Sequence, residues 1–380
     1  MPLTVGDAVE VLESAYDPRW AESWDAVGLV TGDLHQPLRR VLLAVDPAPA
    51  VVDEAVTWSA DLLVTHHPLL LRGVHGVATT TPKGRAVTSL VRAGVALYVA
   101  HTNADVAVPG VSDALADVLG LVDTRPLRRA APAAAYKLVT FVPPADADRL
   151  VDALAAAGAG RIGGYDRCAW TTDGTGTFRG GAGTRPSVGQ PGRVERVSEA
   201  RLEMVLPGAA VAAVTAALRA AHPYEEPAFH LVALSAPAEV ARGTGRVGRL
   251  PRPVPLRDFV AQVRAALPAT AGGVRVGGDP DRLVGSVAVC GGAGDDLFAE
   301  VRASGADVFV TADLRHHPAA EALEHGAPAL VDCAHWATEW PWLASAERVM
   351  RAGLAEHDPA AADSVDTRVS TIVTDPWTSV

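Results

Sequence analysis

Apolar and polar positions alternate along the chain in blocks that predict strands and helices in turn. Short apolar runs at Arg40–Asp46, Asp61–His67 and Ala96–Asn103 predict buried strands. Helical patterns fill the intervals between them, at about Ala48–Ala60 and Lys83–Gly94. Strands that alternate with helices of this length indicate βαβ units and a mainly parallel sheet.

The C-terminal third repeats this rhythm and predicts a second, similar α/β block. Its predicted strands are Ser286–Gly292, Asp307–Asp313 and Pro328–His335. Helices are predicted at Asp295–Ser304 and His317–His325, and a long helix begins near Thr338. The fold class is therefore α/β, built from two similar halves with mainly parallel sheets.

The middle of the chain follows a different plan. Its pattern predicts a strand at Tyr136–Val142 and a helix at Ala147–Ala157, followed by two strand-like stretches on either side of the Gly-rich run Asp173–Gly192. A helix at Ala209–Ala221 and a strand at Ala228–Leu234 complete it. The order βαββαβ is that of ferredoxin-like domains. Segments rich in Pro, Ala and Arg at Arg125–Ala135 and Ser235–Val254 bracket this part, which is interpreted as an insertion. We therefore expect a domain at 131–238 inserted between halves 1–130 and 239–380.

Composition narrows the class of protein. The 380 residues correspond to about two domains at roughly 100–200 residues each. With 33 basic and 44 acidic side chains the net charge is −11, which argues against a general nucleic-acid binder. Three scattered cysteines fit a reducing cytoplasm, and neither a membrane span nor a signal peptide is recognised. We expect a cytoplasmic protein with no membrane partner.

Histidines stand at the ends of predicted strands, and a carboxylate follows two of them at a distance of four residues. The residues of this set are His66, His67, His101, Asp105, His335 and Glu339. In open parallel sheets, ligands bind outside the carboxyl ends of the strands. The set is therefore expected at one rim of a sheet.

These residue types suit a particular kind of ligand. Imidazole nitrogens and carboxylate oxygens favour Zn, Fe, Mn, Co or Ni over Ca or Mg. A carboxylate can also bridge two cations about 3.5–4 Å apart, so a dinuclear site is one option. A single strand-end histidine is more often structural, but a set of this size favours a metal site. His335 and Glu339 can share a face if both belong to one helical turn.

Other motifs are interpreted as structural. Two G-x-G-x-x-G strings begin at Gly158 and Gly243, but neither has the preceding strand and following helix of a dinucleotide site. Both are predicted to be turns or linkers. The doublet His316–His317 could cap a helix or serve the site, and Cys333 is interpreted as a core thiol.

Five segments resemble the Nif3-like family, also called GTP cyclohydrolase type-2 homologues. They are WDAVGLVTGD (Trp24–Asp33), LLVTHHPL (Leu62–Leu69), AHTNADVA (Ala100–Ala107), VFVTADLRHH (Val308–His317) and LVDCAHWATE (Leu330–Glu339). The resemblance covers essentially the whole chain in order. The middle part, with YKLVTFVP, AGAGRIGGYDRC and HPYEEPAF, resembles the PII/CutA-like domain of longer members.

The resemblance implies a toroidal homohexamer with two divalent metal cations per subunit, facing an internal cavity. By the motifs, His67 and Asp105 would hold one metal, His66 and His335 the other, and Glu339 would bridge them. Small departures, Ala104 where Leu is common and Ala312 where Gly is common, remove no ligand.

The same resemblance places three further residues, His101, His317 and Asp46, around the metals. His101 and His317 are the candidates for catalytic proton transfer. The leading hypothesis is a metal-dependent hydrolase that acts on a nucleotide or a related cyclic amide through metal-bound hydroxide. The alternative is a metal-handling or regulatory scaffold whose insert senses a small molecule.

Overall fold

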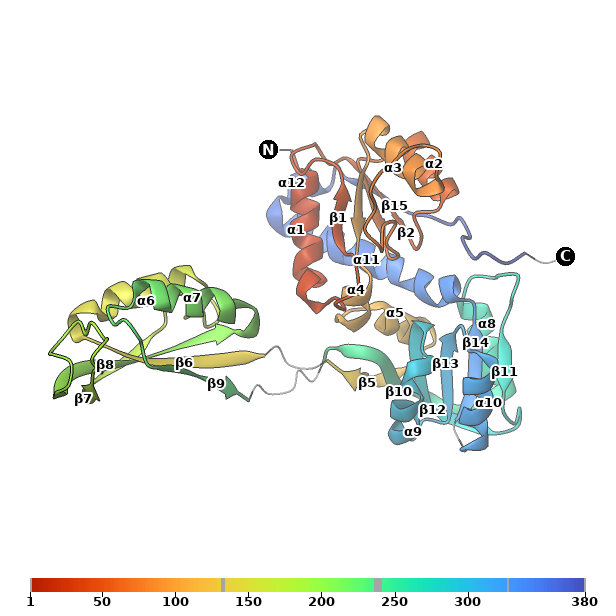
Figure 1. Ribbon diagram of the computed structural model, residues 1–380. Coiled ribbons are helices and arrows are strands. Elements are labelled where there is room, and N and C mark those ends of the chain that lie inside the picture. Colours follow the sequence, from red (N-terminus) through yellow and green to blue (C-terminus); the bar gives the residue numbers. More distant parts are fainter. Residues whose placement is uncertain (1, 131–133, 236–240, 327, 379–380) are drawn as a thin grey trace. The chain divides into compact units, whose positions relative to one another are not determined.

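The computed structural model describes residues 2–130, 134–235, 241–326 and 328–378. The chain forms two compact units, one from residues 1–130 with 240–380 and one from residues 131–239 (Figure 1). The predicted boundaries, 130/131 and 238/239, fall on or beside residues outside the described ranges. Each unit is described by itself below.

The first unit contains a five-stranded sheet in the order β1-β4-β3-β2-β15. Its strands are β1 (Gly28–Thr31), β2 (Arg40–Ala44), β3 (Leu62–Thr65), β4 (Ala96–Val99) and β15 (Asp366–Val369). All neighbours pair in parallel except β1 with β4. The three predicted strands are confirmed, but each ends before the polar residues that follow it. The sequence pattern did not predict β1 or β15, which are only four residues long.

A six-stranded sheet in the same unit has the order β11-β14-β13-β12-β10-β5. Its strands are β5 (Val122–Arg129), β10 (Gly243–Pro255), β11 (Arg275–Gly277), β12 (Leu283–Ala293), β13 (Val308–Ala312) and β14 (Ala329–Cys333). Only β12, β13 and β14 pair in parallel. The prediction of a mainly parallel sheet is therefore wrong for this half, because three antiparallel strands were not recognised.

Two of these strands, β5 and β10, overlap the segments rich in Pro, Ala and Arg that bracket the insert. Their prolines are tolerated because β5 is an edge strand and because Pro251 and Pro253 lie where the pairing of β10 with β12 is interrupted. The second G-x-G-x-x-G string lies in β10, so it is not a turn. A Cβ on Gly243 would be 2.1 Å from the carbonyl oxygen of Arg128 in β5. This glycine serves close strand pairing rather than a cofactor.

Helices cover both sheets and fill the space between them (Figure 1). They are α1 (Val5–Ala15), α2 (Pro49–Thr57), α3 (Pro82–Ala93), α4 (Thr102–Val106), α5 (Val111–Val118), α8 (Leu256–Ala266), α9 (Phe298–Ser304), α10 (His316–Glu324), α11 (His335–His357) and α12 (Pro359–Ala362). One core joins the facing sides of the two sheets through α1, α5 and α11. The outer sides pack on α2 and α3 in one sheet and on α9 and α10 in the other. The result is a layered α/β unit whose centre is α11.

The first helix shows how local sequence sets these elements. Thr4 is its N-cap. The Asp7 backbone N–H donates to the Thr4 hydroxyl, and the Asp7 carboxylate accepts from the Thr4 backbone N–H at 2.7 Å. This reciprocal capping box satisfies two backbone donors that the helix leaves open. Val5, Val9 and Leu12 then face the core.

The second unit has the element order predicted from the sequence. Its elements are β6 (Ala135–Val142), α6 (Ala147–Ala156), β7 (Trp170–Arg179), β8 (Val194–Pro207), α7 (Val211–Ala221) and β9 (Phe229–Leu234). They form an antiparallel sheet in the order β7-β8-β6-β9, and one face of it packs on both helices. Short 3-10 turns occur in both units at Pro18–Trp20, Pro144–Asp146, Gly208–Ala210 and Asp295–Leu297.

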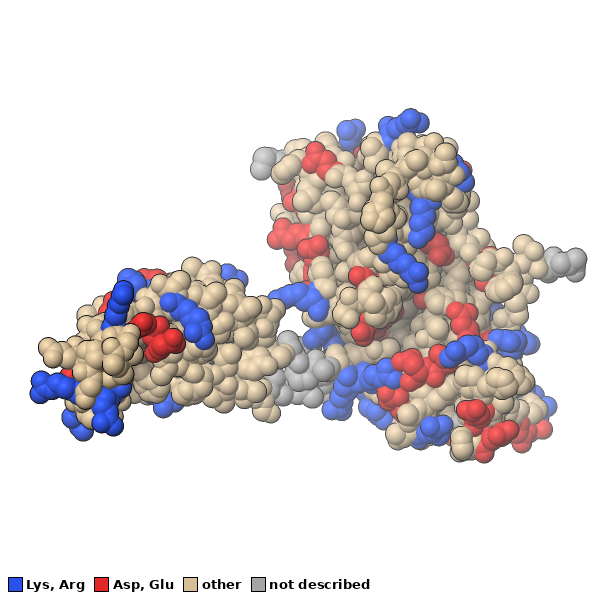
Figure 2. All heavy atoms as spheres, in the orientation of Figure 1, with Lys and Arg blue, Asp and Glu red and all other residues tan. Residues whose placement is uncertain are grey.

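Surface and core chemistry agree with an ordinary folded domain. Acidic and basic side chains are interspersed on the visible face of each unit (Figure 2). Among the described residues, no helix combines the length and apolar character needed to cross a bilayer. Cys333 is buried, and burial raises the pKa of its thiol to about 12, which fits the predicted core role.

Candidate metal centre

The predicted ligand residues meet between the two sheets of the first unit. His66 and His67 follow the end of β3, and His101 follows β4 in the five-stranded sheet. His335 comes from the other sheet, because it follows β14 and opens α11. The expectation of one rim on one sheet is therefore wrong. The carboxyl ends of two sheets contribute to the site, and α11 carries Glu339 into it.

Glu339 is the centre of the cluster. Its side chain is 4% exposed, and His335 Nε2 lies 2.9 Å from its Oε1, one helical turn away. His66 Nε2 lies 3.5 Å from the same oxygen, and His67 Nε2 lies 3.1 Å from Oε2. Asp105 Oδ1 approaches His66 Nε2 at 3.7 Å. One buried carboxylate thus faces three imidazole nitrogens.

Two overlapping groups of ligand atoms are compact enough for a metal ion. One is His66, His67 and His101, and the other is His67, His335 and Glu339. The closest approaches associate His66 with Asp105, whereas the family resemblance implies His67 with Asp105. His317 is exposed on α10 and belongs to neither group in the described ranges, so its predicted catalytic role has no support from its position.

The Nδ1 atom of each histidine in the cluster forms a hydrogen bond with a residue outside the cluster. The acceptors and distances are the Ala100 carbonyl for His66 at 2.9 Å, Asp46 for His67 at 2.7 Å, Asp25 for His101 at 2.9 Å and Asp313 for His335 at 2.7 Å. These acceptors cannot donate, so each Nδ1 carries a proton, and Nε2 is the ring nitrogen that faces the cluster and can bind a cation. Asp46 therefore has the supporting place predicted for it.

This arrangement fits a cation. Imidazole Nε2 atoms and a buried carboxylate converge on the same space, so a cation there would be bound by all of them. Glu339 Oε2 is buried and, within the described part of the chain, makes no hydrogen bond of acceptable geometry. Nitrogen and carboxylate donors together suit transition-metal ions. The cluster can hold a metal ion.

Gly292, at the end of β12, keeps this space open. Its φ is +69°, and a Cβ there would lie 2.6 Å from Glu339 Oε1 and 3.1 Å from His335 Nε2. The Gly292 N–H donates to Thr338 Oγ1, and Thr311 Oγ1 donates to the Gly292 carbonyl, at 2.9 Å each. Any side chain at this position would enter the cluster.

Protons take the place of cations when no metal is bound. Burial alone would lower the pKa of His67 and of His335, but the charge of Glu339 and the carboxylates behind the rings raise these pKa values to about 11 and about 10. Burial would raise the pKa of Glu339, yet the facing histidines lower it well below its ordinary value. His67 and His335 are therefore protonated and Glu339 is ionised at neutral pH.

Metal uptake should consequently release protons. Because both raised pKa values lie above 7, His67 and His335 must each lose a proton before Nε2 can bind a cation. Titration calorimetry in buffers of different ionisation enthalpy should show release of about two protons per chain at pH 7. Affinity should rise with pH up to about 11, the higher of the two pKa values. A binding enthalpy independent of the buffer would contradict this description.

Asp313 supports the site in a way that can be tested without disturbing the backbone. It has a φ of +57°, a left-handed conformation that Asn tolerates as well as Asp. Asp313→Asn should weaken metal binding about 10–100-fold, because the amide is a weaker partner for His335 Nδ1 than the carboxylate. Equilibrium dialysis checks this. Equal affinity, with unchanged thermal stability of the metal-free protein, would exclude such a role.

Three supporting residues were missed by sequence reasoning: Asp25, Asp313 and Gly292. Asp313 ends a predicted strand, so the strand-end signal that identified the histidines also applied to it. Asp25 lies within a motif that was noticed, but nothing local to it indicates a partner 76 residues away. Gly292 depends on contacts that only the fold creates.

Comparison with known proteins agrees with this architecture. The family description Duf34/NIF3 (NGG1p interacting factor 3) matches residues 3–376. The chain belongs to the Duf34/NIF3 family. A protein of Mycobacterium tuberculosis (strain ATCC 25618 / H37Rv) named "GTP cyclohydrolase 1 type 2 homolog" is 52% identical over 378 residues, covering 99% of this chain and 97% of that one. A Streptomyces coelicolor protein of the same name is 38% identical over 99% of this chain and 94% of its own.

Solved structures of the NIF3 type share the fold. The Bacillus cereus protein related to NIF3 has a TM-score of 0.68 at 34% identity, with full coverage of both chains. Staphylococcus aureus protein SA1388 has a TM-score of 0.71 at 27% identity and covers 100% of this chain and 99% of that one. The resemblance noted from the sequence motifs is thereby confirmed at the level of family and mixed α/β fold.

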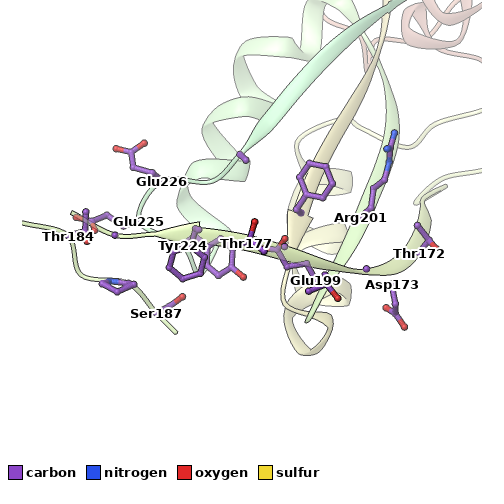
Figure 3. A pocket seen from close by; sticks show the side chains of 18 residues that line it. Thr172, Asp173, Thr177, Thr184, Ser187, Glu199, Arg201, Tyr224, Glu225 and Glu226 are labelled. Carbon is purple, nitrogen blue, oxygen red and sulfur yellow. The ribbon is translucent and has the colours of Figure 1, made fainter. Parts of the chain in front are cut away.

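The second unit contains a separate cavity of about 610 Å³ (Figure 3). Its charged lining residues are Asp173, Glu199, Arg201, Glu225 and Glu226. The one guanidinium among them, Arg201, pairs with Glu203 at 2.7 Å. The excess of carboxylates disfavours an anionic ligand there.

Proposed function

We propose that this chain is a dinuclear metal-dependent hydrolase that acts on a nucleotide or a related cyclic amide. The observation that carries the proposal is the buried Glu339 carboxylate, whose two oxygens face different histidines. Two cations bridged by Glu339 would supply Lewis acidity and an activated water at neutral pH. The enzyme-like names of the relatives support a hydrolase.

The residues divide into two sets around that carboxylate. His66 and His335 face its Oε1, and His67 faces its Oε2, while Asp105 lies beside His66. Together with Glu339 they would hold Zn, Fe, Mn, Co or Ni. Asp46, Asp313 and the Ala100 carbonyl keep the three ligand rings in place, so the donor atoms need little reorganisation to bind.

His101 is the group that would move a proton. Its ring centroid lies 5.1 Å from that of His66 and 5.5 Å from that of His67, so its Nε2 faces the same space. Burial alone would raise the pKa of Asp25, but hydrogen bonds from His101 and Thr102 lower it, so this carboxylate stays ionised. An ionised Asp25 stabilises the imidazolium that forms when His101 accepts a proton at Nε2.

We also propose that the second unit is a ferredoxin-like insert of the PII/CutA type and that the protein assembles as a hexamer. The element order of the second unit and its sheet order β7-β8-β6-β9 support the assignment as a ferredoxin-like insert. The hexamer rests on the family resemblance. Light scattering should give a particle six times the 39.3 kDa chain mass, and a monomer would overturn this part.

A turnover assay tests the activity. Metal-loaded protein should hydrolyse at least one member of a panel of nucleotides and cyclic amides, GTP included. Activity should fall about 100-fold or more in His101→Asn, while metal content stays unchanged. No turnover of any panel member, together with ready metal transfer to an acceptor apo-enzyme, would overturn the hydrolase in favour of a metal-handling protein.

A further inference from the structure

Trp24 is a large apolar side chain exposed at the edge of the metal centre. It is 57% exposed, and its ring lies edge-on to His101 with the centroids 6.0 Å apart. His101 in turn contacts both His66 and His67. Trp24 thus borders the histidine cluster without belonging to either group of ligand atoms.

The segment that carries Trp24 is fixed by its neighbour. The Asp25 side chain is fully buried and accepts from His101 Nδ1 at 2.9 Å, from the Thr102 backbone N–H at 3.1 Å and from the Thr102 hydroxyl. The Glu22 backbone N–H also donates to Thr102 Oγ1 at 3.0 Å. These bonds attach the turn to the start of α4. The backbone that carries Trp24 is therefore held next to His101, and the indole contacts that ring.

A fixed, exposed indole beside a metal centre has a recognisable use. Its π-face can stack on a planar heteroaromatic ring, and a pre-ordered platform avoids the entropy cost of ordering a loop on binding. Phosphate or carbonyl oxygens of the same ligand would meet the cations. The dipeptide Trp24–Asp25 would then do two things, since one residue contacts the substrate base and the next orients His101.

We infer that Trp24 is the base-stacking residue of this site and that the substrate carries a planar nucleobase-like ring. This inference rests on the proposed function and narrows it. It favours nucleotides and fused-ring heterocycles over open-chain amides or simple phosphate esters, because only a planar ring uses the exposed indole face.

Two ligands that share a sugar phosphate but differ in the base test this inference. Zinc-loaded full-length protein is titrated by calorimetry with guanosine 5′-monophosphate and with ribose 5-phosphate. Trp24→Ala should weaken nucleotide binding by about fivefold to a hundredfold and leave ribose 5-phosphate binding and zinc content unchanged. Trp24→Phe should retain most of the affinity. Trp170→Ala, which removes an exposed tryptophan from the second unit, should change neither.

The possible results distinguish a failure of the stacking role from a failure of the proposed hydrolase function. If both ligands bind in a zinc-dependent way but Trp24→Ala weakens them equally or not at all, the stacking role is overturned and the hydrolase proposal stands. If neither ligand binds the zinc-loaded protein, the nucleotide substrate and the stacking role fail together.

Discussion

Replacing Glu339 by glutamine should abolish the metal centre while preserving the fold. Glutamine has the same shape, but it is neutral and offers one oxygen where Glu339 offers two. We expect metal content to fall from about two ions to less than one per chain and affinity to drop by at least about 100-fold. The same change should lower the pKa values of His67 and His335, because the charge that raises them is lost, so metal binding at pH 7 should release fewer protons.

A matched control exists on the same helix. Glu356 is exposed near the end of α11, so Glu356→Gln removes the same charge without entering the cluster. It should leave metal content and affinity unchanged. If Glu339→Gln retained two ions with unchanged affinity, Glu339 would not be a ligand and the proposed geometry would be wrong.

The second large effect is expected at Arg246, a guanidinium that is 2% exposed in β10. It donates to both oxygens of Asp113 at 2.5 and 2.7 Å, and to the carbonyls of Gly243, Gly245 and Ala107. Arg246→Met would remove the guanidinium from Asp113 and from the three carbonyls, and Asp113 would keep its hydrogen bond from the Gly110 N–H at 2.8 Å. The free energy of unfolding should fall by about 3–5 kcal/mol, as for other broken buried ion pairs.

Tryptophan fluorescence during urea unfolding measures this loss in the right unit, because seven of the eight tryptophans lie outside residues 131–239. Arg249→Met, at an exposed position of the same strand, should change stability by less than about 0.5 kcal/mol. Adding Asp113→Leu to Arg246→Met should recover part of the loss, since both ends of the pair are then apolar. A loss below about 1 kcal/mol in the single variant would contradict the assigned role.

Arg246 also connects stability to function. Ala107, whose carbonyl it binds, ends α4, the short helix that carries Asp105. Arg246→Met should therefore weaken metal binding modestly, although Arg246 itself is not a ligand. The helix α4 has only five residues, and the hydrogen bond from Arg246 in β10 stabilises its C-terminal end.

The sequence predicted those parts of the structure that depend on local pattern. The segments that form β2, β3, β4, β13 and β14 are apolar and lie between helices, so their burial could be predicted. The histidine doublet and the His335–Glu339 spacing could also be predicted from local sequence. The doublet follows a single strand end, and one helical turn brings His335 and Glu339 together. Strands β5 and β10 were not predicted, because their prolines and arginines hide the apolar pattern of a strand. The pairing of these two strands nevertheless accommodates both residue types.

The arrangement of the site between two sheets depends on contacts remote in sequence. His66 and Glu339 are 273 positions apart along the chain, and only the packing of α11 between the sheets brings them within 3.5 Å. No periodicity encodes that packing. The same holds for Asp25 with His101 and for Gly292 with Glu339, which are the contacts that orient the ligands and leave room for them.

Elemental analysis of the full-length protein is the most direct test of a dinuclear centre. Protein stripped of metal, reloaded with an excess of zinc and desalted should carry about two ions per chain, and Glu339→Gln treated identically should carry less than one. Manganese or cobalt should give the same ratio if the site accepts the transition-metal class. Wild-type protein that retains no zinc, or that retains as much zinc as the Glu339→Gln variant, would contradict the metal centre described for Glu339 and its histidines.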